Sequence, residues 1–536
     1  MKYLLRPISL AVVVCVLSWS AAVTSADEMS SLSKARSSIR VADIKKHTNV
    51  LASNTFEGRE AGSRGGRASG IYLVGELKKL GVEPAGDRKG YYQEFGAGYR
   101  NILAKLPGSD ASLQNEYILI GAHYDHVGYG TRNNSRGPTG FIHNGADDNA
   151  SGTAAVLELV EAFTQLEPRP KRSILFVLWD AEEKGLLGSE HWVSRPTIPL
   201  RQIRFCLNID MIGRLRKDAV DVWGQRTAPG LRRIVCETNS DSGLSVTFKF
   251  KVARDSDHYP FYERGIPFLF AHTGKHDDYH RPSDDVDKLN IDGIRKVTHL
   301  YFNLLHAVAD SEDLPRYRSV VRRETPYVER EPESSPIRLG VTWDPDLEKK
   351  QIIKLVSVVR GSAAEKGELK PGDRILKFGN LDTKDFPDFR TLVLTSKKEV
   401  PVVIERDGEE KPMTLNLTLG GDRVRLGIAW RTDTAEPRSV ILTNVVPGSP
   451  ADVAGLKSSD RIHRIDGKGF ASSDDFFDLA TTLKSPVPVI FERQGRIRKG
   501  VITVPGESRV ARPRPTGRAW SNGRITGTAL ELNQFA

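Results

Sequence analysis

Two patterns of apolar positions alternate along the first 312 residues of the chain. Short apolar runs have the length of buried β-strands, and longer stretches have the spacing of amphipathic helices. The predicted strands are Tyr91–Leu106 (one or two strands), Tyr117–Ile120, Ile174–Trp179, Ile203–Ile209, Ser245–Phe250 and Ile266–Phe270. The predicted helices lie within 30–55, 71–80, 152–166, from 188, 231–239, 259–264 and 291–309. This alternation predicts an α/β domain over 27–312, with a mixed, mostly parallel sheet flanked by helices.

A second pattern repeats itself after a charged, proline-bearing stretch at 313–336, which we predict to be a linker. RLGVTW at 338–343 recurs as RLGIAW at 425–430, and GSAA at 361–364 recurs as GSPA at 448–451. Both pairs are 87 residues apart, and this constant register indicates two copies of one small strand-rich domain. We place the copies at 337–419 and 423–505. The remaining residues, 506–536, have little apolar pattern and are predicted to be disordered.

The first 26 residues have the pattern of a secretory signal peptide. Lys2 and Arg6 precede an apolar stretch at 8–17, and small residues at 24–26 offer a cleavage site. The apolar stretch is short for a membrane span, although an uncleaved anchor is the alternative. We therefore expect an exported protein, secreted or periplasmic, with no transmembrane span once the signal peptide is removed.

Composition adds two limits. The chain has 536 residues and a formal charge of +10, and its 78 basic and 68 acidic residues are spread along it, so nucleic-acid binding is not indicated. After removal of the signal peptide, only Cys206 and Cys236 remain. A fold with so few cysteines does not depend on disulfides, and the sequence leaves open whether these two pair.

Candidate chemistry begins in KRSILFVLWDAEEK, residues 171–184. Asp180, Glu182 and Glu183 come directly after a predicted buried strand. The carboxyl ends of strands form the usual site of an α/β sheet. Of two adjacent carboxylates there, one can bind a metal while the other acts as a general base. A solvated acidic turn has the same pattern, so the pair alone does not decide between the two.

Other histidines and aspartates follow neighbouring predicted strands. With Glu183 they form a set of five candidate ligands: His123, Asp148, Glu183, Asp210 and His280. Imidazole and carboxylate together suit zinc, and the lack of cysteine ligands argues against a closed structural site. Five ligands are too many for one catalytic zinc that retains a water, but they suit two metals sharing a carboxylate. Asp125 lies on the same side of the strand as His123 and could accept the second imidazole N–H.

Five motifs give a more specific resemblance: GAHYDH, GADDNASG, DAEEKGLLGS, NIDMIGR and DYHRPSD, in this order. The series resembles that of the co-catalytic zinc aminopeptidases, whose family also holds glutamate carboxypeptidases, glutaminyl cyclases and the non-enzymatic transferrin receptor. It covers roughly residues 40–312 and implies the zinc exopeptidase fold.

The resemblance also implies a role for each residue of the set. Two zinc ions would bind per chain, one through His123 and Asp210, the other through Glu183 and His280. Asp148 would bridge them, and it is chosen over Asp147 because it directly precedes the motif's Asn. Glu182 would be the general base, and Asp125 would orient His123. No ligand position is substituted, which argues against a receptor-like, inert domain.

The implied function is an exported zinc-dependent aminopeptidase acting on peptides or proteins. A carboxypeptidase or glutaminyl cyclase of the same family is the nearest alternative, and a scaffold with an inert peptidase domain is another. The stretch ARDSDHYPFYERGIPF at 253–268 resembles the family's pocket-lining segment, so Asp257 and His258 are expected near the substrate. A helix cap and a core contact are the alternative roles for these two residues.

The two repeats resemble PDZ domains. RLGV and RLGI would form the loop that holds a peptide carboxyl terminus, with the peptide added to the sheet edge as a strand. The second copy has Ser458-Ser459 where the first has Pro371-Gly372, which is expected to loosen a turn. Peptide carboxyl termini are therefore expected partners, with substrate positioning as a further role. A purely structural role is the alternative.

Overall fold

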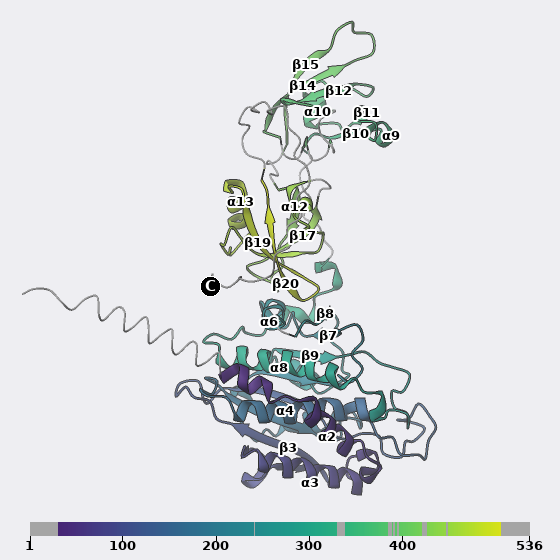
Figure 1. Ribbon diagram of the computed structural model, residues 1–536, viewed down its shortest axis with the longest axis vertical. Helices are drawn as coiled ribbons and strands as arrows, with labels where there is room; N and C mark the ends of the chain where they lie inside the picture. The colour runs from purple at the N-terminus through teal and green to yellow at the C-terminus, as the bar shows by residue number, and fades with distance from the viewer. Residues whose placement is uncertain are drawn as a thin grey trace, which may run out of the picture.

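The computed structural model describes residues 31–240, 242–329, 338–383, 389, 392–393, 396–420, 426–445 and 449–504 (Figure 1). These residues form an α/β domain and two smaller β-rich domains. The signal peptide predicted for 1–26 and the tail predicted for 506–536 lie outside the described residues. None of the described helices is long and apolar enough to cross a membrane.

A mixed nine-stranded sheet runs through the α/β domain, in the order β1-β3-β5-β4-β6-β9-β7-β8, with β2 paired to β3. Its central strands β5, β4, β6 and β9 are parallel neighbours; β3 runs antiparallel to β5, and β7 runs antiparallel to β9 but parallel to β8. The strands are β1 (Glu83–Pro84), β2 (Tyr92–Phe95), β3 (Tyr99–Leu106), β4 (Tyr117–His123), β5 (Ser173–Trp179), β6 (Ile203–Ile209), β7 (Ala219–Trp223), β8 (Ser245–Lys249) and β9 (Phe268–His272).

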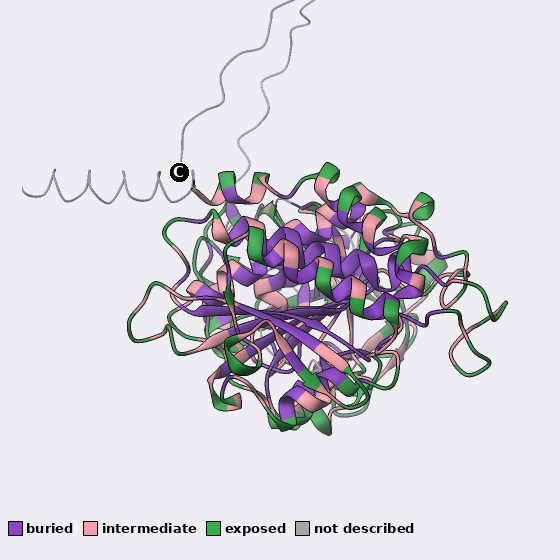
Figure 2. Cartoon of the chain, turned by 90° about the horizontal axis from the view of Figure 1, so that it is seen from below, coloured by how far each residue is buried: buried purple, intermediate pink, exposed green. Residues whose placement is uncertain are grey.

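Helices cover both faces of this sheet. The helices are α2 (Val41–Leu51), α3 (Arg64–Lys79), α4 (Gly152–Thr164), α5 (Leu187–Ser194), α6 (Leu231–Thr238), α7 (Tyr259–Glu263) and α8 (Ile291–Asp310). Figure 2 shows the buried layer of helices lying along the sheet. In α8 the predicted apolar face, from Ile294 to Val308, is buried in the main core, and the Asn290 side chain caps the helix by accepting the N–H of Gly293.

The predicted α/β class and its mixed sheet are confirmed, with parallel strands at the centre of the sheet, but two strands were not predicted, β7 and the two-residue β1. β7 reads AVDVW, and only two of its five residues are fully buried. A strand this short, with polar residues on both sides, gives too little alternation to stand out from a loop. β7 matters because it pairs with β8 and β9 and completes one edge of the sheet.

The two small domains have the same strand order, and their pairing registers differ by the predicted 87 residues. Val341 pairs with Val358 in the first copy, and Ile428 pairs with Val445 in the second. The first sheet holds β10 (Val341–Trp343), β11 (Ile353–Val358), β12 (Arg374–Phe378), β13 (Leu381–Asp382), β14 (Glu399–Glu405) and β15 (Met413–Thr418). The second holds β16 (Ile428–Arg431), β17 (Val440–Val445), β18 (Arg461–Ile465), β19 (Val487–Arg493) and β20 (Arg496–Ile502). The short helices are α9 (Pro345–Glu348) and α10 (Ala363–Lys366) in the first copy, and α12 (Pro450–Val453) and α13 (Ser473–Thr482) in the second.

The Ser458-Ser459 departure leaves the turn of the second copy in place. Asp460 accepts the N–H of Lys457 at 2.8 Å, as Asp373 accepts that of Lys370 at 2.8 Å in the first copy. Ser459 adopts a positive φ of 72°, as Gly372 does at 94° in the first copy. The turn is therefore retained, with a serine in a conformation that favours glycine.

The arrangement in space does not follow chain order. The second copy lies between the α/β domain and the first copy (Figure 1). The described part of the predicted linker, 313–329, carries two short 3₁₀ turns, η6 (Ser319–Arg322) and η7 (Pro326–Glu329). Cys206 and Cys236, whose pairing the sequence left open, are both buried and unpaired.

Candidate metal centre

The candidate ligands come together at one edge of the sheet because β4, β5 and β6 are parallel and end side by side. His123 is the last residue of β4, Glu183 lies in the turn after β5, and Asp210 directly follows β6. Asp148 lies in a helical turn, η3 (Ala146–Ser151), that leads into α4. Parallel strands therefore bring together residues that are far apart in sequence.

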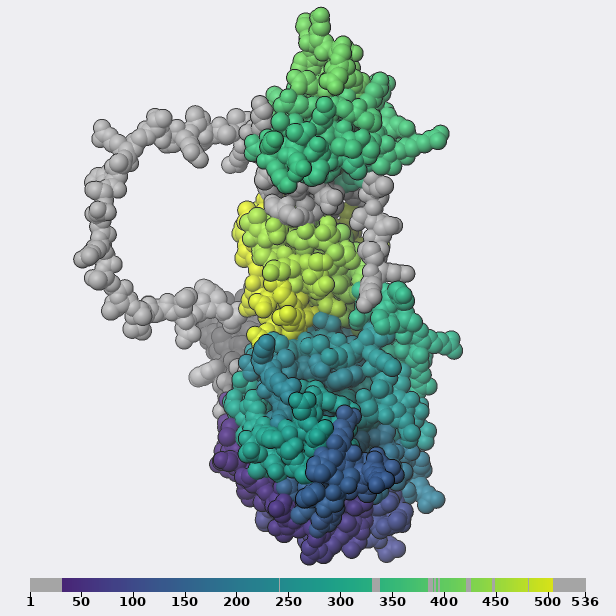
Figure 3. Space-filling view, turned by 90° about the vertical axis from the view of Figure 1, so that its right-hand side faces the viewer, coloured from purple at the N-terminus to yellow at the C-terminus, as the bar shows by residue number. Residues whose placement is uncertain are grey.

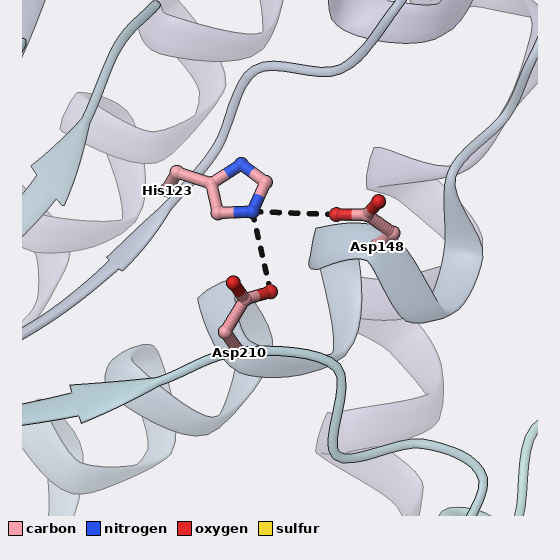
Figure 4. A group of neighbouring side chains, drawn as sticks. All are labelled: His123, Asp148 and Asp210. Atoms are coloured by element: carbon pink, nitrogen blue, oxygen red, sulfur yellow. Dashed lines mark hydrogen bonds and ion pairs between the residues drawn. The ribbon is translucent and has the colours of Figure 1, made fainter. Parts of the chain in front are cut away.

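A first group forms around Nε2 of His123 (Figure 4). This nitrogen lies 3.3 Å from Oδ1 of Asp148 and 3.3 Å from Oδ1 of Asp210. One donor atom from each of these three residues lies within 4.8 Å of the others. Asp210 is held in place by the Ser256 hydroxyl, which donates to its Oδ2 at 2.8 Å.

A second group forms around the other oxygen of Asp148. Nε2 of His280 lies 3.1 Å from Oδ2 of Asp148 and 3.1 Å from Oε2 of Glu183. Asp148 thus presents one carboxylate oxygen to each group. The neighbouring Asp147 takes no part, because its carboxylate accepts the N–H of Gly213 at 2.5 Å and contacts His276 at 3.1 Å.

His126 is a member of the site that was not predicted. Its Nδ1 lies 2.8 Å from Oε1 of Glu183, and its donor atoms group with those of Asp148 and Glu183 within 4.8 Å. The residue closes the motif GAHYDH, which was the available signal. It could not be placed, because β4 ends at His123 and the strand alternation no longer applies beyond it.

The orientation of the imidazoles fits a cation. Nδ1 of His123 lies 3.2 Å from the main-chain oxygen of Asp125, and Nδ1 of His280 lies 2.8 Å from that of Asn134. Because a carbonyl only accepts, these contacts keep a ring proton on Nδ1, so a neutral ring presents the lone pair of Nε2 to the carboxylates. An Nε2 lone pair that faces carboxylate anions is stabilised by a cation placed between them.

The electrostatics of the same residues point the same way. Burial alone would lower the pKa of His280, but contact with Asp148 and Glu183 outweighs it and raises the pKa to about 10. The site therefore stabilises positive charge strongly. Imidazole nitrogen with carboxylate oxygen is a donor set that zinc accepts. The residues present fit two cations that share Asp148.

Asp125 and Glu182 lie beside the two groups. The Asp125 carboxylate accepts the N–H of Glu182 at 3.1 Å and that of Glu183 at 3.3 Å, which fixes the turn after β5. Its Oδ1 is 3.7 Å from Nδ1 of His123, so the imidazole N–H faces the main-chain oxygen of Asp125 more closely than the carboxylate. Without cations between the two groups, desolvation, opposed by His123 and reinforced by Asp257, raises the pKa of Glu182 well above its usual value.

A cavity of about 270 Å³ opens over these residues. Its lining includes the candidate ligands and Glu182, and also Trp223 and Phe270, whose rings stack with centroids 5.2 Å apart. Tyr279 also lines the cavity and stacks on His280 at 3.9 Å. The cavity is therefore lined by charged side chains and by the stacked Trp223–Phe270 pair, which we call its aromatic wall.

The two residues expected near the substrate, Asp257 and His258, do not line the cavity. His258 stacks on Phe270 with ring centroids 4.7 Å apart and packs at a tilt against Phe268 at 4.6 Å, which is the core contact named as its alternative role. Asp257 is buried and accepts a hydrogen bond from Ser189 at 2.6 Å. From the same segment it is Asp255 that lines the cavity.

Comparison with known families decides the identity of the larger domain. Residues 101–305 match the family model of Peptidase family M28. The chain carries an M28 peptidase domain. Residues 355–406 match the PDZ domain model, so this match covers the first copy only. The second copy is called PDZ-like here because it repeats the strand order and register of the first.

Curated relatives of the M28 domain include three named peptidases or inactivating enzymes. Leupeptin-inactivating enzyme 1 of Streptomyces exfoliatus is 31% identical over 43% of this chain and 48% of its own length. Leucine aminopeptidase 1 of Grosmannia clavigera is 27% identical over 52% of this chain and 70% of its own. Aminopeptidase YwaD of Bacillus subtilis is 26% identical over 38% of this chain and 43% of its own. The chain thus spans about half the length of the first of these relatives.

Solved structures similar to the chain include two of named activity. The LapA aminopeptidase of Legionella pneumophila is 21% identical, with a TM-score of 0.45, over 53% of this chain and 75% of that one. A Zn-dependent exopeptidase from Parabacteroides distasonis is 20% identical, with a TM-score of 0.43, over 50% of this chain and 98% of that one.

Proposed function

We propose that the chain is an exported, zinc-dependent aminopeptidase that removes amino-terminal residues from peptides and holds two zinc ions. The observation that carries the proposal is the position of Asp148, whose two oxygens face two separate groups of donors. His123 and Asp210 would hold one ion, and Glu183 and His280 the other. The aminopeptidases among the curated relatives support the choice of reaction.

The roles of the protein's own groups follow from their positions. Zinc bound there would polarise the scissile carbonyl and acidify the attacking water. Glu182 lines the cavity and belongs to neither donor group, so its carboxylate is free to take a proton from water and pass it to the leaving amine. A cavity of about 270 Å³ suits one terminal residue rather than a long stretch of peptide.

The rest of the proposal rests on sequence. Lys2, Arg6 and the apolar stretch at 8–17 support export by a cleaved signal peptide. The match of residues 355–406 to the PDZ domain supports binding of peptide carboxyl termini by the first copy, which would position substrates. The amino-terminal sequence of the exported protein tests the first point, and titration with free and amidated peptides tests the second.

The reaction itself is tested on the purified chain without its signal peptide. We expect two equivalents of zinc and cleavage of peptides with a free amino terminus. An amino-terminal block should abolish cleavage, whereas a carboxyl-terminal block should not. Cleavage that depends on a free carboxyl terminus would instead indicate a carboxypeptidase. Cyclisation of an amino-terminal glutamine would indicate a glutaminyl cyclase. A chain with no bound metal and no turnover would reject the proposal.

A further inference from the structure

The second PDZ-like copy is joined to the edge strand of the M28 sheet by main-chain contacts. β8 is the last strand of that sheet, and the N–H of Val246 in β8 donates to the main-chain oxygen of Gln494 at 3.1 Å. The Asn239 side chain donates to the oxygen of Gly495 at 2.8 Å. A Cβ built on Gly495 would lie 2.4 Å from Cβ of Val246, so the turn between β19 and β20 approaches β8 as closely as glycine allows. Figure 3 shows the second copy, in yellow and light green, seated directly on the M28 domain.

Two charged pairs anchor this contact. The guanidinium of Arg232 in α6 donates to both oxygens of Glu492, at 3.0 and 3.1 Å. The guanidinium of Arg226 donates to both oxygens of Asp433, at 2.5 and 3.0 Å. Glu492 has no exposed surface, and the side chains of Arg226 and Asp433 are each only 4% exposed. Paired two-point contacts of this kind are strong, and separating them would leave buried charge without a partner.

The linker reinforces the same contact. Glu324 accepts from Arg226 at 2.8 Å, and Arg318 donates to Glu324 at 2.7 Å and to the hydroxyl of Thr434 at 2.9 Å. Arg431 of the second copy donates to the main-chain oxygens of Val328 and Glu329. Residues 318–329 therefore tie the second copy to the M28 domain as well as connecting the chain.

The first copy carries the same residue types in a different setting. Its counterparts of Asp433 and Glu492, 87 residues earlier, are Asp346 and Glu405. These side chains are 83% and 53% exposed, and they pair with Lys349 and Arg374 of the same copy. The position of Glu436, which contacts Arg232 at 3.9 Å, is occupied by Lys349 in the first copy. The buried acidic side chains that pair with the arginines of the M28 domain are therefore found in the second copy only, among the described residues.

The docked edge lies next to the wall of the substrate cavity. β7 carries Asp221 and Trp223, which both line that cavity, and Arg226 follows three residues after Trp223. β8 pairs with β7 along its whole length and ends in Lys249. The Lys249 ammonium lies 2.9 Å from Oδ2 of Asp221 and 5.9 Å from the centre of the Trp223 ring. The second copy contacts β8, and β7, which carries the cavity-lining Asp221 and Trp223, is the next strand of the sheet.

We propose that the second PDZ-like copy is a fixed part of the peptidase unit that positions the Asp221–Trp223 wall of the substrate cavity. Asp433 and Glu492 are its anchors and act as positioning residues, since neither lines the cavity. The inference rests on the proposed function for its kinetic part, because substrate turnover reports the position of the wall. The two copies therefore have different roles: the second is a fixed part of the enzyme, and the first is available to bind peptides.

The test uses the full exported chain with Asp433→Ala and Glu492→Ala combined, and Asp346→Ala with Glu405→Ala as the matched control. We expect KM for a dipeptide to rise on the order of ten-fold in the first variant, with kcat within about two-fold and zinc content unchanged. Hydrogen exchange should lose protection at 243–249 and at 219–223 in the same variant. The control should match the wild type in every measurement.

Each result decides one part of the proposal. Unchanged protection at 243–249 in the anchor variant would show that the copy is not held by these residues. Lost protection there with unchanged KM and unchanged protection at 219–223 would show that docking does not position the wall. Should the double variant fail to fold, Arg226→Asp combined with Asp433→Arg takes its place, and recovery of KM relative to either single variant supports the pair. Exchange at 219–223 needs no turnover, so it decides the inference even if the proposed reaction is wrong.

Discussion

Nδ1 of His126 lies 2.8 Å from Oε1 of Glu183, while Oε2 of the same carboxylate lies 3.1 Å from Nε2 of His280. His126 therefore holds one oxygen of Glu183 and leaves the other facing the donor group. Groups that contact a ligand in this way orient it, and their loss commonly lowers metal affinity about 10- to 100-fold. Without His126, the Glu183 carboxylate is free to rotate.

We predict that His126→Ala lowers zinc affinity at one of two sites by about 10- to 100-fold. Competition with a chelator, followed by metal analysis of the protein, measures this loss for each equivalent separately. His299→Ala, on helix α8, is the control and should bind both equivalents as the wild type does. Equal affinity in His126→Ala would remove His126 from the metal centre.

Glu182 and Glu183 are adjacent but should respond differently to the same change. Glu182 lines the cavity outside both donor groups, whereas Glu183 contacts His126 and His280. We predict that Glu182→Gln keeps both zinc equivalents and lowers kcat by about 10²- to 10⁴-fold, because a carboxamide cannot accept the proton of water. Glu183→Gln should instead lose metal. Metal analysis and steady-state kinetics on the two variants give the comparison, and full turnover in Glu182→Gln would reject its role as the base.

The sequence predicted what depends on strand ends and missed what depends on packing between distant elements. His123, Asp148, Glu183, Asp210 and His280 were chosen because they follow successive predicted strands, and the structure brings them together. His126 lies beyond the end of β4, where no periodicity indicates the direction of a side chain. In the segment 253–268, Asp255 rather than Asp257 or His258 reaches the cavity, because that segment has no regular repeat before α7 begins.

The docking of the second copy onto the M28 domain could not be predicted from the sequence either. Asp433 and Glu492 have identical residues at the matching positions of the first copy, Asp346 and Glu405. Their different settings depend on Arg226 and Arg232, more than 200 residues away in the chain. Only the folded arrangement shows that one pair is buried against the M28 domain while the other is exposed.

The aromatic wall should set the preference for the first residue of the substrate. Trp223 and Phe270 stack on each other and both line the cavity that holds the candidate ligands. We predict that Trp223→Ala lowers kcat/KM for an amino-terminal Leu or Phe by about 10- to 100-fold, since the contact removed is worth roughly 1–3 kcal/mol. Substrates with an amino-terminal Ala should lose much less, and they serve as the internal control. An equal loss for all three residues would mean that the wall supports the fold rather than the specificity.

Glu158, on the buried side of helix α4, should make the stability of the M28 domain fall as pH rises. Its side chain is 1% exposed; Oε2 accepts the N–H of Arg40 at 3.0 Å, and Oε1 lies 3.9 Å from Nε2 of His47. Burial raises the pKa of Glu158 to about 8, and burial likewise lowers the pKa of His47 to about 4, so the neighbouring imidazole is neutral at pH 7. An unfolded glutamate titrates near about 4.3.

Between these two pKa values the folded chain holds a proton that the unfolded chain has lost. The free energy of unfolding therefore decreases as pH rises from about 5 to 8, by at most about 1.4 kcal/mol per pH unit from this group. Glu158→Gln removes the titration, so its melting temperature relative to the wild type should increase steadily over that range. Calorimetry at pH 5 and pH 8 measures the difference, with Glu161→Gln on the same helix as the control. A difference between variant and wild type that stays constant across this range would show that Glu158 is ionised in the folded protein at pH 5 already.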